Sequence, residues 1–403
     1  MANVLEELEK RGYIEQYAHG DELKKLINEG KKISFYIGID PTADSMHIGH
    51  FIPLMVVSRL QQAGHKPYIL MGGGTATIGD PSGKTDMRKM LSREQLDSNV
   101  ECIKEQAKRF VSFEGENAAV IVNNGDWLLD LKYIDFMREI GSQFTVSTML
   151  AQECYKNRLG TGLTFFEMGY LLLQSYDFLY LHDKYDVKLQ IGGNDQWSNI
   201  LGGVDLIRKM GKEDSFAMTM RLLTNKDGVK MGKTVSGALW LNKDKCSPYD
   251  FYQYWRNIDD QDVKKVMNML TFISDEEIEE LTKYNDERMN IAKKRAAFEI
   301  TKLIHGEEEA KKAEEAAEGL FGQGANLDNV PEYKLEDISI LNAIVGSGFA
   351  PSKGQAKDLI KQGGITLNDA KVEDIGYQLQ DDDFKEGYAL LKKGKKGFVK
   401  LIK

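Results

Sequence analysis

The sequence predicts an α/β fold: a Rossmann-like, doubly wound parallel sheet in residues 1–220, then an all-helical domain and a small α+β domain. In residues 1–220, short apolar runs alternate with helical patterns and end in glycine, which is typical of parallel strands joined by crossover helices. Residues 247–321 have a helical pattern throughout. A polar linker at 322–335 separates them from residues 336–403, a segment near the lower size limit for independent folding.

End signals support the helical domain. Ser247 precedes Pro248, which is a cap followed by proline at the first helical position, and Ser274 with Glu277 forms a capping box. Glu307 and Lys311 have the spacing of a helix-surface ion pair. We interpret that stretch as a solvated face without chemistry.

Composition indicates a globular protein of two or three domains. The chain has 403 residues, of which 42% are hydrophobic and 29% charged. Its N-terminus lacks a basic start and an apolar core, and no apolar run approaches the ~20 residues that cross a bilayer. The three cysteines are widely separated, so neither a disulfide framework nor a zinc site is expected. We therefore expect a cytoplasmic protein with no membrane segment.

The most informative motif is His47-Ile48-Gly49-His50. It follows a predicted buried strand at 33–39 and a turn at 40–44, and it leads into an apolar-periodic helix at 51–60. Free N–H groups and the positive end of a helix dipole make such a turn a phosphate seat, and Gly49 allows close approach. Taken alone, two histidines at this spacing are more often incidental.

A second motif, Lys230-Met231-Gly232-Lys233-Thr234, lies in the connecting region 221–246. Two lysines, a glycine and a hydroxyl form a mobile cationic loop that can close over a polyphosphate and stabilise developing charge. Taken alone, a solvated loop is the better interpretation. The pairing with the histidine motif favours the functional one.

The predicted helix 165–182 carries an unusual polar stripe. It is rich in Phe, Leu and Tyr, yet Tyr170, Gln174 and Asp177 recur at i, i+4 and i+7, which places a phenol, an amide and a carboxylate on one side. Buried polar groups require partners. Either the stripe is a satisfied structural network or an exposed face, or it binds a zwitterionic, hydroxyl-bearing ligand such as tyrosine.

Together, the two motifs resemble the signatures of class I aminoacyl-tRNA synthetases, the lysine motif being a variant of the Lys-Met-Ser-Lys-Ser loop. Three further segments resemble the bacterial tyrosyl-tRNA synthetases, and the similarity covers nearly the whole chain. These segments are Phe35-Tyr36-Ile37-Gly38-Ile39-Asp40-Pro41-Thr42-Ala43-Asp44, Gly79-Asp80-Pro81-Ser82-Gly83-Lys84 and Leu189-Gln190-Ile191-Gly192-Gly193-Asn194-Asp195-Gln196-Trp197.

The resemblance implies a two-step reaction. The tyrosine carboxylate attacks the α-phosphate of ATP to form tyrosyl-adenylate and pyrophosphate, and a terminal ribose hydroxyl of tRNA(Tyr) then takes the acyl group. A carboxylate is ionised at neutral pH, so the first step needs no general base. Magnesium accompanies ATP, and no dedicated protein metal site is expected.

The resemblance also implies a residue set for each substrate. Thr42, His47, His50, Lys230, Lys233 and Thr234 form the catalytic set. Tyr36, Asp80, Tyr170, Gln174, Asp177, Gln190 and Gln196 bind tyrosine, with Tyr36 and Asp177 on its phenolic hydroxyl and Asp80, Tyr170 and Gln174 on its ammonium group. ATP is bound by Gly38, Asp40, Thr42, His47, Gly49, His50, Gly193, Asp195, Lys230 and Lys233.

A few residues near these motifs differ from the sequences of the family or have no role that the resemblance assigns. Ile37 and Pro53 lie where some relatives carry a cysteine and a threonine, which puts peripheral ribose contacts in doubt. The segment from Gly79 to Thr85 has three residues between its glycines where a P-loop needs four. Lys84 and Arg88 either approach phosphates or have a simple surface role.

The C-terminal segment carries the nucleic-acid signal. The net charge of the chain is −9, but lysines slightly outnumber acidic residues from Glu336 onward. Ser352 starts a predicted helix whose Lys353, Lys357 and Lys361 form one stripe, a surface suited to phosphate contacts. A solvated face is the alternative. The segment resembles the small RNA-binding domain of ribosomal small-subunit protein four, which implies that it binds tRNA.

Further lysines follow at Lys392, Lys393, Lys395 and Lys396, and the all-helical domain is expected to approach the anticodon arm. Rival interpretations are a tryptophanyl-tRNA synthetase and a catalytically silent paralogue that binds RNA. Tyr36 with Asp177 argues against the first, because an indole has no hydroxyl. The class usually forms homodimers, and the apolar stretch 144–150 could supply an interface.

Overall fold

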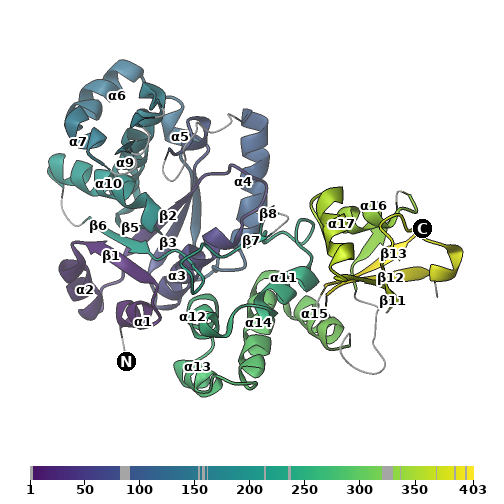
Figure 1. Cartoon of the computed structure of the whole chain (residues 1–403). Helices are drawn as coiled ribbons and strands as arrows, with labels where there is room; N and C mark the ends of the chain where they lie inside the picture. Colours follow the sequence, from purple (N-terminus) through teal and green to yellow (C-terminus); the bar gives the residue numbers. More distant parts are fainter. Residues whose placement is uncertain are drawn as a thin grey trace. The chain divides into compact units, whose positions relative to one another are not determined.

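The computed structural model describes residues 3–81, 91–152, 155–156, 159–160, 162–212, 215–234, 237–319, 330–335, 337–368, 370–384, 387–394 and 397–403. The chain forms two compact units, one of Met1–Met231 with Gln261–Glu280 and the other of Gly232–Asp260 with Leu281–Lys403 (Figure 1). No helix in the described ranges is both long and apolar enough to span a membrane.

A six-stranded sheet forms the centre of the first unit. Its strands are β1 (Ile14–Ala18), β2 (Ser34–Ile39), β3 (Lys66–Met71), β4 (Val120–Asn123), β5 (Val187–Gly193) and β6 (Phe216–Met220), in the order β1-β6-β5-β2-β3-β4. All neighbours are parallel except β1 and β6. The predicted doubly wound sheet is confirmed, with one antiparallel edge strand, a common addition to parallel sheets.

Crossover helices join these strands. The helical segments of this unit are α1 (Val4–Lys10), α2 (Gly20–Asn28), η1 (Ile48–His50), α3 (Phe51–Gln62), η2 (Thr75–Thr77), α4 (Arg93–Ala107), α5 (Gly125–Leu128), α6 (Tyr133–Glu139), η3 (Gly141–Gln143), α7 (Val146–Leu150), α9 (Phe165–Tyr185), η4 (Asn194–Gln196) and α10 (Trp197–Lys209). Figure 1 shows α3 and α4 on one side of the sheet and α9 and α10 on the other. Their packing buries the sheet, whose strand β3 has five buried residues out of six.

The order in which strands are added to the sheet changes direction at the neighbouring parallel strands β2 and β5. From β2 it winds through β3 to β4, and it then returns to place β5 on the opposite side of β2. Parallel strands that diverge in this way leave a crevice at their carboxyl ends, the usual ligand site of such sheets. Ile39 pairs with Met71, which pairs with Asn123, so the ends of β2, β3 and β4 lie in register.

Helix α9 begins at a complete capping box. Thr164 accepts a hydrogen bond from the Glu167 N–H, and the Glu167 carboxylate accepts one from the Thr164 N–H. The helix ends at Asp186, whose φ of 51° is left-handed. It packs closely on α10, where a Cβ on Gly203 would lie 2.9 Å from Phe178 Cδ1. This packing fixes the polar stripe of α9 beside the sheet.

The segment Gln261–Glu280 differs from the predicted domain boundary. The helical pattern predicts that it belongs to the helical domain 247–321, whereas the structure groups it with the sheet unit. It holds most of α12 (Asp260–Leu270) and the start of α13 (Asp275–Thr282). Side chains of the sheet unit, among them Arg59 and Tyr13, bind carbonyls in this segment. Such contacts between distant positions leave no periodic signal in the sequence.

The second unit contains helices and a short hairpin. The hairpin consists of β7 (Lys233–Thr234) and β8 (Gly237–Ala238), and the helices are α11 (Pro248–Arg256), α14 (Met289–His305) and α15 (Glu307–Gly319). Ser247 caps α11 by accepting a hydrogen bond from the Asp250 N–H, as the Ser-Pro signal predicts. Glu307 pairs with Lys311 at 2.8 Å on the exposed side of α15.

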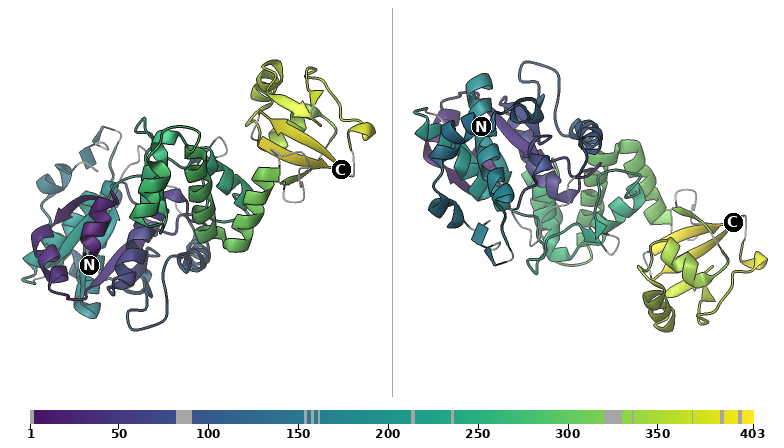
Figure 2. Two further views of the ribbon diagram at one scale, coloured as in Figure 1. Left: turned by 90° about the horizontal axis from the view of Figure 1, so that it is seen from below. Right: turned by 90° about the horizontal axis from the view of Figure 1, so that it is seen from above.

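The C-terminal module is a five-stranded sheet with two helices packed against it (Figures 1 and 2). Its elements are β9 (Glu332–Lys334), α16 (Ile340–Gly346), α17 (Lys353–Lys361), β10 (Ile365–Leu367), β11 (Ala370–Lys371), η5 (Asp381–Asp383), β12 (Tyr388–Lys393) and β13 (Gly397–Ile402). Strand β9 pairs with β13, so the module begins inside the predicted linker 322–335. Three residues are too few for a strand signal in the sequence.

Candidate active site

The histidine motif lies between β2 and α3, as predicted, but two of its backbone N–H groups donate to imidazoles of the motif itself. The His47 N–H donates to His50 Nδ1 at 3.2 Å, and the Gly49 N–H donates to His47 Nδ1 at 3.0 Å. The two rings lie 4.3 Å apart between centroids. The expected seat of free N–H groups is therefore capped by the imidazoles of the motif itself, and an anion reaches the Gly49 N–H only when the His47 ring turns away.

Burial sets the protonation state of His50. It lowers the pKa of His50 to about 3, with the neighbouring His47 as a further cause. His50 is therefore neutral near pH 7. Because its Nδ1 accepts a hydrogen bond, its Nε2 carries the proton and is a donor. Such a group suits hydrogen bonding to a ligand better than proton transfer.

Asp40, at the carboxyl end of β2, accepts two hydroxyl hydrogen bonds. Thr75 Oγ1 donates to Oδ1 at 2.8 Å and Tyr170 Oη donates to Oδ2 at 3.0 Å. Burial raises the pKa of Tyr170 well above its ordinary value, which keeps the phenol a donor. A Cβ on Gly72 would lie 2.0 Å from Asp40 Oδ1, so glycine is required beside this carboxylate. The structure thus joins a residue predicted to bind ATP to one predicted to bind tyrosine.

Asp177 lies 1% exposed on α9 between two N–H donors. Asn124 Nδ2 donates to Oδ2 at 2.9 Å, and the Trp127 indole nitrogen donates to Oδ1 at 2.8 Å. Burial raises the pKa of Asp177 to about 8, against the lowering effect of these two hydrogen bonds. The carboxylate is held in one orientation and remains costly to ionise without a further donor.

Sequence reasoning missed Asn124 and Trp127. Asn124 also accepts from the Gly74 N–H at 2.7 Å and donates to Thr75 Oγ1 at 3.0 Å, so it links Asp177 to the carboxyl end of β3. The sequence does contain a signal for Asn124, because Asn123, Asn124 and Gly125 directly follow the apolar residues 120–122 of β4. Polar residues at that position reach the ligand edge of a parallel sheet.

Among the residues predicted to bind tyrosine, three buried side-chain atoms have no hydrogen-bond partner in the described part of the chain. They are Tyr36 Oη, Gln174 Oε1 and Gln190 Oε1. Tyr36 is 1% exposed and Gln190 2% exposed, and burial raises the pKa of Tyr36 well above its ordinary value, so its phenol stays neutral. Buried polar atoms are almost always paired. All three atoms belong to residues that were predicted to bind tyrosine.

A second carboxylate cluster lies around Asp80, which is 5% exposed. Gln196 Nε2 donates to Asp80 Oδ2 at 2.6 Å, and Asn199 Nδ2 approaches Asp80 Oδ1 at 3.4 Å and Gln196 Oε1 at 3.1 Å. Asp80 and Gln196 were both predicted to bind tyrosine, and the structure brings them together. Asn199 was not predicted and extends this network into α10.

The predicted nucleotide residues lie at the ends of β2 and β5. Gly38 is exposed within the otherwise buried end of β2, and a Cβ there would meet only Leu70 at 3.8 Å. Thr42 is exposed, and its N–H donates to the Asp40 carbonyl at 2.8 Å. Gly193 ends β5, and a Cβ on it would lie 2.6 Å from Asp195 Oδ1. These two strand ends flank the point where the strand order changes direction.

The lysine motif is divided between the two units. Lys230 is exposed in the first unit and forms an isolated bridge with Thr224. Lys233 and Thr234 form β7 in the second unit, and their side chains lie outside what the structure describes. Lys84 and Arg88 also lie outside the described residues. The roles expected for these residues remain predictions.

Comparison with known proteins gives the family. The model for tRNA synthetases class I (W and Y) matches residues 28–322. The chain belongs to this family of class I tRNA synthetases. The model for the tyrosine–tRNA ligase SYY-like C-terminal domain matches residues 322–401.

Full-length relatives of this class I synthetase are also known. A protein named tyrosine–tRNA ligase 1 from Clostridium acetobutylicum is 52% identical over 100% of both chains. A tyrosine–tRNA ligase from Clostridium botulinum is 54% identical over 100% of this chain and 99% of its own. The crystal structure of a C-terminally truncated Aspergillus nidulans mitochondrial tyrosyl-tRNA synthetase has a TM-score of 0.70 and 28% identity, over 78% of this chain and 93% of that one.

The predicted lysine stripe of this synthetase lies on α17. Ser352 Oγ accepts from the Gln355 N–H at 3.4 Å at the start of the helix, as predicted. Lys353, Lys357 and Lys361 are all exposed. Of the later lysines, Lys392 and Lys393 lie on β12, whereas Lys395 and Lys396 are outside the described residues.

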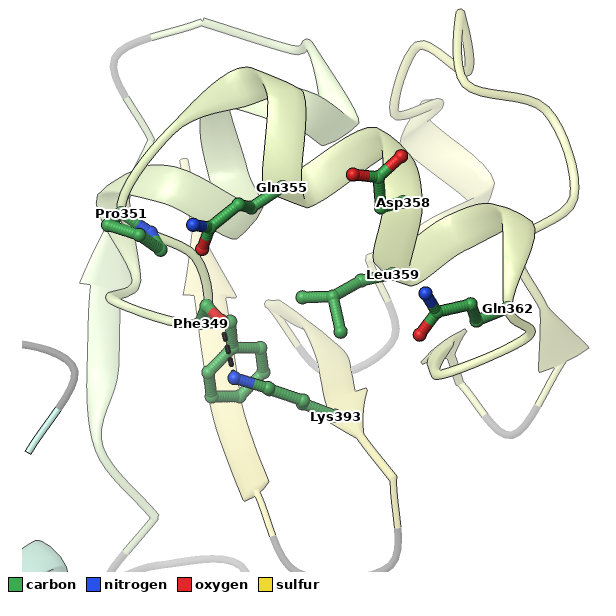
Figure 3. Close-up of a pocket in the computed structure, with 7 residues that line it drawn as sticks. All are labelled: Phe349, Pro351, Gln355, Asp358, Leu359, Gln362 and Lys393. Carbon is green, nitrogen blue, oxygen red and sulfur yellow. Dashed lines mark hydrogen bonds between the residues drawn. The ribbon is translucent and has the colours of Figure 1, made fainter.

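A cavity of about 220 Å³ lies on another side of α17 (Figure 3). It is lined by Phe349, Pro351, Gln355, Asp358, Leu359, Gln362 and Lys393, and Lys393 Nζ donates to the Phe349 carbonyl at 2.6 Å. The lysine stripe contributes nothing to this lining, because its positions fall on a different side of the helix. The exposed stripe and the cavity are therefore separate surfaces.

Among the described residues, no three His, Cys, Asp or Glu side chains are arranged to hold a metal ion. The polar constellation at the carboxyl edge of the sheet is instead rich in hydroxyl, amide and carboxylate groups. Such groups bind a small polar ligand through hydrogen bonds.

Proposed function

We propose that this chain ligates L-tyrosine to tRNA(Tyr) with ATP, forming tyrosyl-adenylate and pyrophosphate before acyl transfer. The tyrosine–tRNA ligase activity follows from family membership and from relatives of that name that are 52–54% identical over the full length. The single observation that carries the amino-acid specificity is that the buried Tyr36 hydroxyl has no hydrogen-bond partner among the described residues and lies close enough to the buried Asp177 carboxylate for that charge to raise its pKa.

In this proposal the phenolic hydroxyl of tyrosine lies between Asp177 and Tyr36. It donates to the carboxylate and accepts from the Tyr36 hydroxyl, which satisfies both groups at once. Phenylalanine would leave both unpaired in the interior, and tyrosine-specific enzymes are the known example of rejection by this means. An indole could supply one donor but no hydroxyl acceptor.

The ammonium group of tyrosine is assigned to Asp80, Tyr170 and Gln174. Gln174 Oε1 is buried and lacks a partner among the described residues, so an ammonium donor would satisfy it. Gln190 and Gln196 complete the tyrosine set, Gln196 through its hydrogen bond to Asp80. Binding energy from these contacts positions the tyrosine carboxylate for attack.

ATP is assigned to the carboxyl ends of β2 and β5. Thr42 and His47 contact its terminal phosphate, His50 and Asp195 lie near ribose, and magnesium enters with the phosphates. The neutral state of His50 supports a role in holding ATP. Catalysis then rests on positioning and on charge stabilisation of the departing pyrophosphate by Lys230, Lys233 and Thr234.

The tRNA is assigned to the C-terminal module and the helical domain. Three exposed lysines on one side of α17 support phosphate contacts there. A cytoplasmic location belongs to the same proposal, since it is where free tRNA and ATP meet.

A homodimer is supported by exposed apolar side chains on α6, α7 and α9. They are Tyr133 at 61% exposed, Ile134 at 71%, Val146 at 58% and Phe165 at 70%. Large apolar side chains at the surface are typical of protein interfaces. Val146 falls in the predicted stretch 144–150, and sedimentation equilibrium with Ile134→Glu tests the dimer.

Exchange of labelled pyrophosphate into ATP tests the enzymatic proposal. We expect exchange that depends on tyrosine and that neither phenylalanine nor tryptophan supports. Exchange driven by tryptophan would indicate the sister specificity, and an absence of exchange with every amino acid would indicate a silent RNA-binding protein. Charging of tRNA(Tyr) with labelled tyrosine tests the second step.

A further inference from the structure

Lys265 binds the base of the turn that carries Lys230. Its ammonium group, on α12, donates to the Thr224 carbonyl. Thr224 bridges Lys230 across the turn, so the acceptor lies directly beside the lysine of the motif. Asp262, 2% exposed, holds Lys265 from one turn earlier on the helix at 3.3 Å. A paired ammonium group loses rotamer freedom and keeps its direction.

The turn itself is closed by its own hydrogen bonds. The Asn225 N–H donates to the Val229 carbonyl at 2.8 Å, and Asn225 Oδ1 accepts from the N–H groups of Asp227 and Val229 at 3.0 and 2.9 Å. The Met231 N–H donates to the Leu223 carbonyl at 2.8 Å. A turn closed in this way moves as one piece, so its position depends on how its base is held.

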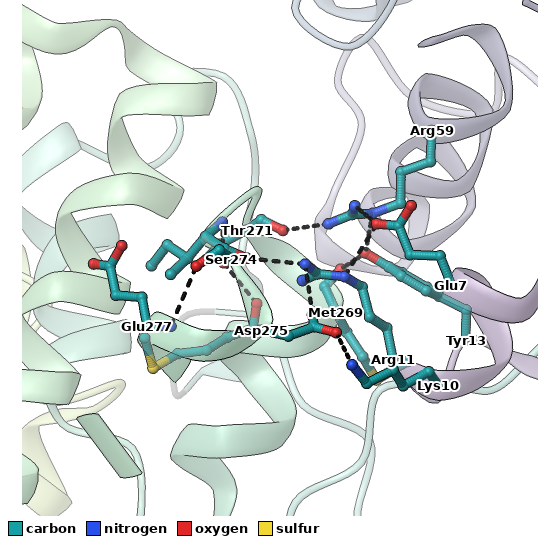
Figure 4. A network of polar contacts seen from close by, with 12 residues as sticks. Glu7, Lys10, Arg11, Tyr13, Arg59, Met269, Thr271, Ser274, Asp275 and Glu277 are labelled. Carbon is teal, nitrogen blue, oxygen red and sulfur yellow. Dashed lines mark hydrogen bonds and ion pairs between the residues drawn. The ribbon is translucent and has the colours of Figure 1, made fainter. Parts of the chain in front are cut away.

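Helix α12 is anchored at its far end by Arg11 and Tyr13, which lie in the turn after α1, and by Arg59 of α3 (Figure 4). Tyr13 Oη donates to the Met269 carbonyl at 2.8 Å, Arg59 Nη2 to the Thr271 carbonyl at 2.7 Å, and Arg11 Nη2 to the Ile273 carbonyl at 3.0 Å. The last carbonyls of a helix lack partners within it, and cationic side chains there also suit the helix dipole. The Tyr13 hydroxyl therefore caps the last turn of α12, and the two arginines hold the residues directly after it.

The anchor connects with the histidine motif through α3. This helix begins directly after His50 and carries Arg59 near its other end. Arg59 is 6% exposed and its guanidinium pairs with Glu7. The same guanidinium lies over the Phe272 ring at 4.9 Å, so contacts on two sides fix the orientation of the side chain. One rigid path thus runs from the histidine motif through α3 and α12 to Lys265.

We propose that Lys265 is a positioning residue for Lys230: it fixes the lysine turn through the Thr224 carbonyl on a helix anchored to α3. The proposal rests on the assignment of Lys230 to the departing pyrophosphate. Lys265 itself touches no substrate. Its loss should leave tyrosine binding intact and slow only the step in which charge develops on the pyrophosphate.

The test is Lys265→Met, which keeps most of the side-chain volume and removes the ammonium group. We expect the kcat of tyrosine-dependent pyrophosphate exchange to fall about tenfold, with the dissociation constant of tyrosine unchanged within a factor of two. Rates are normalised to the concentration of tyrosine-binding sites, so unfolded protein does not count as lost activity. Lys265→Arg keeps a donor and should restore most of the rate.

A double-mutant cycle separates positioning from general damage. If Lys265 acts through Lys230, Lys265→Met has no further effect in a Lys230→Ala background. Lys264→Met, at the neighbouring exposed residue that pairs with Glu279, is the matched control and should behave like wild type. An unchanged rate in Lys265→Met, or effects that multiply in the double variant, overturns the proposal. Wild type without tyrosine-dependent exchange would instead overturn the proposed function.

Discussion

The indole nitrogen of Trp127 donates a hydrogen bond to Asp177 Oδ1 at 2.8 Å. With the amide of Asn124 on Oδ2 at 2.9 Å, it leaves the carboxylate aligned for one more donor. Trp127 is also stacked on Tyr180, with ring centroids 4.3 Å apart. An aromatic side chain held on its face and at its nitrogen gives Asp177 a rigid support.

Replacement of the carboxylate should weaken hydroxyl recognition. We expect Asp177→Asn to lower the preference for tyrosine over phenylalanine roughly 10- to 100-fold, because a hydrogen bond to a buried charge is lost. Amino-acid-dependent pyrophosphate exchange measures the ratio of kcat/KM for the two substrates. Asp183→Asn, on the exposed side of the same helix, is the control. An unaltered preference in Asp177→Asn would contradict the pocket assignment.

Tyrosine affinity should depend on pH through Asp177. Burial raises the pKa of Asp177 to about 8, and a phenol that donates to the carboxylate favours the ionised form. Binding therefore releases a proton, and the affinity for tyrosine relative to phenylalanine should strengthen up to about tenfold per unit as the pH rises toward 8.

Calorimetry at pH 6, 7 and 8 measures this effect, and the dependence should vanish in Asp177→Asn. A tyrosine-to-phenylalanine affinity ratio that stays flat from pH 6 to 8 would count against the proposal.

The raised pKa of Asp177 also affects the stability of the fold. Because the pKa is higher in the folded state than in the unfolded state, the ligand-free fold is favoured while Asp177 is protonated. This contribution to the free energy of unfolding is lost as the pH rises from about 4 through 8.

A methyl group at Gly49 should disturb ATP binding alone. A Cβ there would lie 2.7 Å from His47 Cε1 and 2.9 Å from His47 Nδ1, so the imidazole must leave its position. We expect Gly49→Ala to raise the KM for ATP about tenfold or more, with the tyrosine dissociation constant kept. Gly115→Ala, where a Cβ meets nothing within 4 Å but the φ is 92°, controls for unrelated loop strain. Equal loss of tyrosine and ATP binding in Gly49→Ala would indicate general misfolding.

Neutralisation of the α17 stripe should affect tRNA and leave adenylate formation unchanged. We expect the triple substitution of Lys353, Lys357 and Lys361 by Ala to weaken tRNA binding and to lower the slope of log affinity against log salt by about 2 to 3. Filter binding from 50 to 200 mM salt measures the slope. Lys25→Ala, exposed on α2, is a control of the same charge type. An unchanged slope would make the stripe a solvated face.

The local parts of this fold could be predicted from the sequence because each has a periodic or capping signal. The strand expected at 33–39 is observed at Ser34–Ile39, and the helix expected at 165–182 is observed at Phe165–Tyr185. The stripe of Tyr170, Gln174 and Asp177 could be found because one helix orders it. In the structure, Tyr170 bonds Asp40 and Asp177 accepts from Trp127, whereas Gln174 Oε1 has no hydrogen-bond partner among the described residues.

Relationships between distant segments were not predictable. The bonds from Asn124 and Trp127 to Asp177 join positions 53 and 50 residues apart within the connection between β4 and β5. The segment Gln261–Glu280, which groups with the sheet, is bonded there by Arg11 and Arg59. The capped state of the histidine motif depends on two ring orientations, which no residue pattern specifies. A sequence pattern predicts which face of a helix or strand is polar, but the packing of distant segments determines which residues contact that face.

The two parts of the proposed site, the surroundings of Asp177 and the ATP contacts, lie on different segments around the change of strand order between β2 and β5. Asp177 and the two residues that bond it, Asn124 and Trp127, lie on the connection between β4 and β5, whereas the proposed ATP contacts other than the two lysines lie where β2 and β5 lead into η1 and η4. Substitutions around Asp177 can therefore change recognition of the amino-acid side chain within one connection, whereas substitutions at Tyr170 also reach Asp40 of the proposed ATP site. For protein engineers, the surroundings of Asp177 are therefore the part of the pocket in which side-chain preference can be redesigned first.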